Sequence, residues 1–227
     1  TLLNSLKNIG NKHDVFVIGY KLPKEFTDQF KNLSFLVKLY DIPEEEAREF
    51  GGEGEILCRK RYWYAAEWGK DYDAVCLLDA DMLAVRDMDN FFEIASHGFI
   101  LGATLEQKKV YGSHVHQNVL GHNFFPVPVW NDKDMCCTPM FIDAKQYGGM
   151  LKDSWLIFAG GYPDNNFKAP DQEAFNMLCL KGGLNHRKVF LPNMSRLGSN
   201  EKLLKFNKRL RVKRTDCCGQ NQVNLFV

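Results

Sequence analysis

The sequence lacks the features that would place it in several specialised classes of protein. No apolar run reaches the roughly 18 residues of a transmembrane helix, and no signal peptide opens the chain. The 29 basic and 28 acidic side chains leave a net charge of only +1, which argues against a protein that coats nucleic acid or an anionic membrane. We therefore expect a soluble domain, cytoplasmic or part of a larger protein, with no transmembrane segment and no nucleic-acid partner.

The cysteines lack the spacing of a metal or disulfide framework. Seven are present, including the neighbours Cys136 with Cys137 and Cys217 with Cys218, but there is no CxxC motif. Zinc ribbons need such a motif, and disulfide frameworks are typical of much shorter secreted chains. We expect buried, reduced thiols and therefore a reducing compartment.

What the sequence does contain is an alternation of short apolar runs with helical patterns. The runs predict strands at 15–19, 35–40, 74–78, 98–104, 137–143 and 222–227. The patterns predict helices at 1–8, 24–32, 44–50, 55–68, 89–96, 144–158 and 170–181. We expect a single α/β domain over 1–227, with a Rossmann-like, mostly parallel sheet covered by helices on both faces. Residues 107–135 show little periodicity and are predicted to form a wall or lid of the active site.

Four pairs of aspartates have DxD spacing, and their context distinguishes one pair. Asp79 follows directly on the apolar run AVCLL, and Asp81 leads into MLAV. On an extended backbone both carboxylates would point to one side and reach a single ion, while Ala80 would keep the other side small. Oxygen ligands suit Mn²⁺ or Mg²⁺, which complete their coordination with phosphate and water. The other pairs are expected to be solvated charges: Asp71 with Asp73, Asp87 with Asp89, and Asp132 with Asp134.

Three stretches, in order along the chain, carry a family resemblance. They are LLNSLKNIGNKHDVFVI at 2–18, YDAVCLLDADMLAV at 72–85 and APDQEAFNMLC at 169–179, and LPN follows at 191–193. Together they resemble glycosyltransferase family 8, the glycogenin-like retaining enzymes with a GT-A fold. The resemblance implies Mn²⁺-assisted (or Mg²⁺-assisted) transfer of a hexose from a UDP-sugar to a hydroxyl of a glycan, protein or small molecule. It also implies retention of the anomeric configuration.

The same resemblance assigns roles to particular residues. It implies that Asp79 and Asp81 hold the metal and, with Ala80, the diphosphate of the donor. Asp171 and Gln172 would be the catalytic residues beside the transferred sugar. A second interpretation of Asp171 stays open, because a carboxylate at a helix start also accepts hydrogen bonds from backbone N–H groups.

A basic residue upstream of the aspartates contacts the sugar or diphosphate in this family. Arg59, Lys60 and Arg61 all lie near that place, and their spacing leaves the choice among them open. Lys60 and Arg61 are taken as the donor-binding candidates.

The sequence departs from the family in two places. CCTPMFID at 136–143 stands where the family has its acceptor-side Asn-Ser/Ala-Gly segment, so the acceptor is not identified. The family's late histidine motif is absent. We expect the chain to be cut at both ends, with its first strand missing and a histidine ligand due immediately after Val227. The alternative third ligands are His114, His116, His122 and His186.

Two rival functions remain open. A nucleotide-sugar nucleotidyltransferase could share the fold, although that class normally opens with a glycine-rich loop and a basic residue, which this sequence lacks. A non-catalytic module that binds a nucleotide sugar is the second rival.

Overall fold

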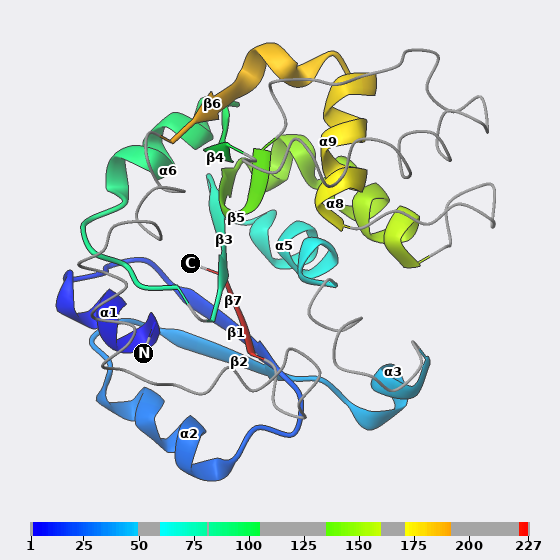
Figure 1. Ribbon diagram of the computed structural model, residues 1–227. Helices are drawn as coiled ribbons and strands as arrows, with labels where there is room; N and C mark the ends of the chain where they lie inside the picture. Colours follow the sequence, from blue (N-terminus) through cyan, green and yellow to red (C-terminus); the bar gives the residue numbers. More distant parts are fainter. Residues whose placement is uncertain are drawn as a thin grey trace, which may run out of the picture.

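The fold is built on one sheet of seven strands (Figure 1). A computed structural model describes residues 2–49, 60–80, 82–104, 135–159, 171–191 and 223–226, and gives the backbone alone at 49, 103, 104, 137, 158, 171, 173 and 223–226. The strands lie in the order β2-β1-β7-β3-β5-β4-β6. They are β1 (Val15–Gly19), β2 (Val37–Asp41), β3 (Val75–Asp79), β4 (Ile100–Thr104), β5 (Met135–Ile142), β6 (Lys188–Phe190) and β7 (Val223–Phe226).

Strand direction differs from the prediction. β1 with β2 and β4 with β6 are parallel pairs, whereas all four pairs that involve β5 or β7 are antiparallel. The predicted mostly parallel sheet is therefore wrong, and the sheet is mixed and only partly parallel. The prediction relied on crossover helices, which make neighbouring strands parallel. β5 lies antiparallel to both β3 and β4, and the chain that leads into it, from 105 to 134, lies outside the described residues.

Helices cover both faces of the sheet, as predicted. In Figure 1, α5, α8 and α9 lie on one side of the strands, and α1 and α6 lie on the other. Each side has its own cluster of buried apolar side chains. The helices are α1 (Leu2–Asn8), α2 (Lys24–Asp28), α3 (Glu44–Glu49), α5 (Arg61–Gly69), α6 (Asp89–Ser96), α8 (Ala144–Ala159) and α9 (Asp171–Lys181), with 3-10 turns η1 (Gln29–Asn32) and η2 (Leu184–Arg187).

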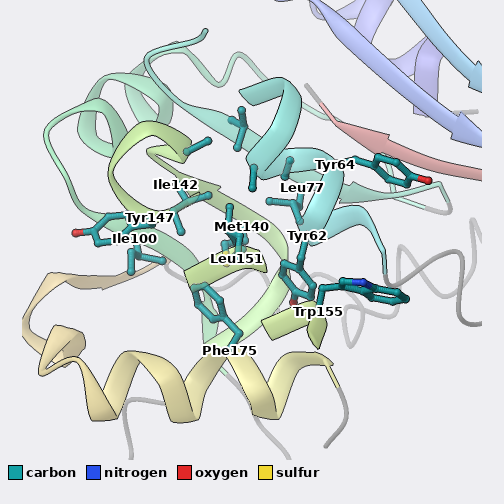
Figure 2. Close-up of a cluster of buried hydrophobic side chains, with 14 of the residues drawn as sticks. Tyr62, Tyr64, Leu77, Ile100, Met140, Ile142, Tyr147, Leu151, Trp155 and Phe175 are labelled. Carbon is teal, nitrogen blue, oxygen red and sulfur yellow. The ribbon is translucent and has the colours of Figure 1, made fainter. Parts of the chain in front are cut away.

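The larger apolar core packs the sheet against α5, α8 and α9 (Figure 2). Its centre includes Tyr62 and Phe175, both fully buried, whose rings stack with centroids 6.1 Å apart. Leu77 of β3 belongs to this core, whereas its neighbours Cys76 and Leu78 belong to the core on the opposite face. This alternation is the ordinary pleat of a strand. The pleat therefore directs the side chain of Asp79, the residue after Leu78, towards α5.

Each predicted strand and helix is present where the structure describes it, with ends that differ by up to two residues and with 29–32 in a 3-10 turn. The predicted helix at 55–68 is described from Arg61, and the predicted lid lies almost wholly outside the described residues. One residue joins β5 to α8, and its carboxylate caps the helix: Asp143 Oδ1 accepts the backbone N–H groups of Lys145 (2.8 Å) and Gln146 (3.0 Å). Such a cap fixes where α8 begins.

Two expectations, on membrane spans and on the cysteines, can be compared with the described part of the chain. None of its helices is both long and apolar enough to cross a bilayer. Cys76, Cys136 and Cys179 are free thiols, two of them buried, as expected. Burial raises the pKa of the Cys76 thiol well above its ordinary value, which keeps that thiol neutral and unreactive.

Candidate functional site

Asp79 ends a buried strand and remains partly open to solvent. The four preceding residues of β3 are buried, whereas the Asp79 side chain is 39% exposed. The Asp79 carbonyl accepts the Met82 N–H at 3.1 Å, so the chain turns immediately after the strand. The extended backbone assumed for the DxD segment is therefore wrong. Ala80 does pack against the opposite core, as expected, while Asp81 lies outside the described residues.

Two side chains hold the Asp79 carboxylate, one on each oxygen. Arg61 Nη1 lies 2.5 Å from Oδ1, and Thr138 Oγ1 donates to Oδ2 at 2.6 Å. Arg61 is the first residue of α5, and Thr138 lies on β5, the strand paired with β3. The Arg61 side chain is 11% exposed and Thr138 is 8% exposed, so both donors are fixed in the protein interior.

This arrangement has an electrostatic consequence for any cation. Arg61 offsets the negative charge of Asp79 at close range, so a divalent ion gains little attraction from this carboxylate alone. Each carboxylate oxygen nevertheless has a second lone pair, and the exposed side of Asp79 can still bind a further group. A cation that arrives together with an anion, which can pair with Arg61, fits this geometry better than a free cation does.

The basic run at 59–61 is divided between two environments. Arg61 contacts Asp79, while Lys60 Nζ lies 2.5 Å from Glu46 Oε1 on α3. Arg59 lies outside the described residues. The structure therefore brings Arg61, rather than Lys60, to the aspartate that the sequence singled out.

Glu46 is the acceptor at the centre of a half-buried polar cluster. Besides Lys60, the Tyr64 hydroxyl donates to Oε1 and the Tyr40 hydroxyl donates to Oε2 at 2.7 Å. Burial alone would raise the pKa of Glu46, but the hydrogen bonds from Lys60 and the two tyrosines outweigh it and hold that pKa below its ordinary value. Burial and Glu46 raise the pKa of both tyrosine hydroxyls, which stay protonated donors. The cluster joins α3 to α5.

The helix that carries the other predicted residues begins at Asp171, whose backbone alone is described. Gln172 is half-buried in its first turn, and the Gln172 carbonyl accepts a bond from Asn176 Nδ2 at 2.9 Å. Asn176 also bonds both backbone groups of Met135: its Oδ1 accepts the N–H at 3.0 Å, and its Nδ2 donates to the C=O at 2.8 Å. Met135 is the first residue of β5, the strand of Thr138. The start of α9 is thus tied to the strand that also holds Asp79.

The last described strand lies beside Asp79 in an unexpected direction. β7 pairs antiparallel with β3, with Asn224 opposite Asp79 and Phe226 opposite Leu77. β7 therefore runs away from Asp79 as it approaches Val227. Val227 lies outside the described residues, so the expected histidine ligand after it stays a prediction. The part of β7 that adjoins the site is its beginning.

The other acidic pairs and histidines behave differently from Asp79. Asp87 and Asp89 are exposed, as are Asp71 and Asp73, which agrees with the expectation of solvated charges. His186 is exposed on η2, and its Nδ1 lies 2.8 Å from the Gly183 carbonyl. Within the described segments, no three His, Cys, Asp or Glu side chains form a metal-binding group. The remaining predicted groups lie outside these segments: Asp132, Asp134, His114, His116 and His122.

Sequence reasoning missed three residues that shape this site. Thr138 and Asn176 act through partners far along the chain, and Glu46 was not separated from its acidic neighbours. Thr138 was marked only as part of a segment that departs from the family. Comparison of the chain with known protein families, with curated proteins and with solved structures finds no match.

Proposed function

We propose that this chain is a retaining glycosyltransferase that transfers a hexose from a UDP-sugar to a hydroxyl acceptor, assisted by Mn²⁺. The observation that carries the proposal is the half-exposed Asp79 carboxylate at the end of a buried strand, fixed by Arg61 and Thr138. Carboxyl ends of strands in open α/β sheets are the usual place for nucleotides. The sequence around Asp79 and around Asp171 resembles glycosyltransferase family 8, and we propose its GT-A fold for this mixed sheet.

Arg61 links the geometry to a donor substrate with a diphosphate. A guanidinium group pairs well with phosphate oxygens, and Arg61 already lies at the carboxylate where a metal would be held. We propose that the diphosphate brings the metal, pairs with Arg61 and frees Asp79 to act with Asp81 as a ligand. When bound, Mn²⁺ supplies Lewis-acid stabilisation for the departing diphosphate. Lys60 is proposed to have a structural role only, through its ion pair with Glu46.

The transfer itself exchanges one glycosidic bond for another. The bond between the anomeric carbon and the UDP oxygen breaks, and UDP leaves with the electron pair. The acceptor oxygen forms a new bond to that carbon, and its proton passes to the departing UDP. Gln172 and Asp171, at the start of α9, are proposed to position the sugar during this exchange, because Asn176 ties that helix turn to the strand of Thr138. The acceptor is proposed to be a glycan, a protein or a small molecule.

The first test separates the enzyme from both rivals by its products. The protein is incubated with UDP-glucose, UDP-galactose or UDP-N-acetylglucosamine and Mn²⁺, and the released nucleotide is identified. A glycosyltransferase given an acceptor releases UDP, a nucleotidyltransferase given added pyrophosphate consumes it and releases UTP and sugar 1-phosphate, and a non-catalytic module binds without release. Absence of both UDP release and UDP-sugar binding would refute the proposed function.

The second test concerns the metal. Isothermal titration should show weak binding of Mn²⁺ alone and clear binding of Mn²⁺ with UDP. Asp81→Asn should remove most of the metal-dependent binding, whereas Asp87→Asn, on an exposed carboxylate, should change little. Arg61→Met should strengthen binding of Mn²⁺ alone and weaken binding of UDP, because the charge that opposes the cation and pairs with the diphosphate is removed. Equal effects of Asp81→Asn and Asp87→Asn would show that the wrong pair was chosen.

The third test concerns the proposed role of α9. Gln172→Ala should lower turnover more than affinity for UDP, because its proposed partner is the sugar and not the nucleotide. NMR of the product should show retention at the anomeric carbon. An inverted product would contradict membership of the retaining family.

A further inference from the structure

A pocket lies away from Asp79, along α5 and two neighbouring strands. The pocket has a volume of about 680 Å³, which is within the range of small-molecule sites. Its walls come from α5, from β1 and β2, and from the turn that leads into β3. Trp68, near the far end of α5, lies seven residues or about 10 Å along the helix from Arg61. The pocket is therefore distinct from the site proposed for the donor.

Aromatic rings in fixed positions form much of the lining. The Trp68 indole stacks on Tyr64 with centroids 4.7 Å apart and on Phe16 with centroids 5.7 Å apart, at interplanar angles of 19° and 20°. The Tyr40 ring packs edge-to-face with Trp68, with ring centroids 5.2 Å apart. Trp63, one turn before Glu67 on α5, adds a second indole to the wall. Rings held by one another keep their positions when a ligand binds, which reduces the entropy lost on binding.

Polar groups of both signs surround these rings. Lys38 and Lys70 are matched in number by Glu67 and Asp71, so the lining has no net charge. Lys38 Nζ is held by the Tyr72 hydroxyl at 2.8 Å and lies 3.5 Å from an oxygen of Asp14. The lining thus combines donors, acceptors and apolar ring surface, and it favours neither an anion nor a cation.

We propose that this pocket binds a neutral saccharide. A sugar ring presents apolar C–H groups, which pack on aromatic rings, and hydroxyls, which both donate to carboxylates and accept from ammonium groups. A purely apolar ligand would remove water from the lysines and carboxylates of the lining and offer no hydrogen bonds in exchange, at a cost in free energy. A charged ligand would gain no net attraction from a balanced lining. The class of ligand that satisfies rings, lysines and carboxylates together is a neutral polyhydroxylated one.

The test is an NMR titration of the ¹⁵N-labelled protein with maltohexaose, cellohexaose and mannohexaose. The indole N–H signals of Trp63 and Trp68 should shift and saturate with at least one of these neutral oligosaccharides. The signal of Trp155, which is 3% exposed in the core, should not move. Hexagalacturonate serves as the anionic comparison and should bind at least tenfold more weakly. The same chemical-shift changes in the Asp79→Asn variant would show that the pocket binds saccharide independently of the proposed donor site.

Two variants complete the test. Trp63→Ala should weaken binding roughly tenfold, the equivalent of about 1.4 kcal/mol for one packed ring. Phe26→Ala removes a partly buried ring from α2, against the opposite core, and should leave binding unchanged. Asp71→Ala, on an exposed side chain, offers a second pocket variant if Trp63→Ala does not fold. Failure of all three neutral oligosaccharides to move either indole up to low-millimolar concentration overturns the proposal, as does tighter binding of hexagalacturonate.

Discussion

Thr138→Val tests whether the hydroxyl really holds Asp79. Valine has nearly the shape of threonine, so the substitution removes the 2.6 Å bond to Asp79 Oδ2 without opening a cavity. A hydrogen bond to a charged group contributes about 1.5–3 kcal/mol. Water can reach the carboxylate, because Asp79 is 39% exposed, and can replace part of the lost bond. We therefore expect a loss near the lower end of that range, about 1.5 kcal/mol.

The loss would be measured as a change in the free energy of unfolding from urea titrations. Thr27→Val is the matched control, because the Thr27 hydroxyl donates to the Lys24 carbonyl at an exposed position, and it should cost about 0.5 kcal/mol or less. In the Asp79→Asn background, Thr138→Val should cost less than in the wild type, since the acceptor is then neutral. If Thr138→Val costs no more than the control, or costs the same in both backgrounds, the hydroxyl does not hold the carboxylate as described.

Glycine positions and the Glu46 cluster yield three further predictions. Gly102→Ala should lower the free energy of unfolding by about 1–3 kcal/mol, because its Cβ would lie 2.8 Å from the Cys136 carbonyl oxygen. Gly149→Ala, in α8 with nothing within 4 Å of the new Cβ, should raise it by about 0.5–1 kcal/mol, and a decrease would contradict this. Glu46→Gln should destabilise the protein at neutral pH. Because folding lowers the pKa of Glu46, its carboxylate contributes its full stabilisation above the unfolded-state pKa of 4.5 and loses it as the pH falls further. Urea titrations should therefore give the wild type and Glu46→Gln the same free energy of unfolding in acid.

The position of Asp79 could be predicted because local features determine it. A short run of apolar residues ends in a carboxylate, and such a run must end where its backbone leaves the core. Arg61 could only be placed among three candidates. Successive residues of a helix point about 100° apart, so only one of three neighbours can face a given point, and which one depends on where the helix begins.

Thr138 and Asn176 could not be predicted in their roles, because each acts through the pairing of distant segments. Thr138 meets Asp79 only because β5 runs antiparallel beside β3 in a particular register. Nothing in the sequence near Thr138 specifies that neighbour. The same limitation explains the wrong prediction of a mostly parallel sheet: the elements themselves were predicted, but β7 entered between β1 and β3 in the opposite direction.

The position of β7 also has a consequence for the order in which the protein folds. β1 and β3 are not hydrogen-bonded to each other, and β7 supplies the backbone bonds on both sides of the gap. Phe16 pairs with Phe226, almost the whole length of the chain away. Contacts so distant in sequence form slowly, because a large loop must close first. During synthesis, the facing edges of β1 and β3 therefore remain without these backbone partners until residues 223–226 leave the ribosome. Unpaired strand edges are open to wrong pairing in that interval.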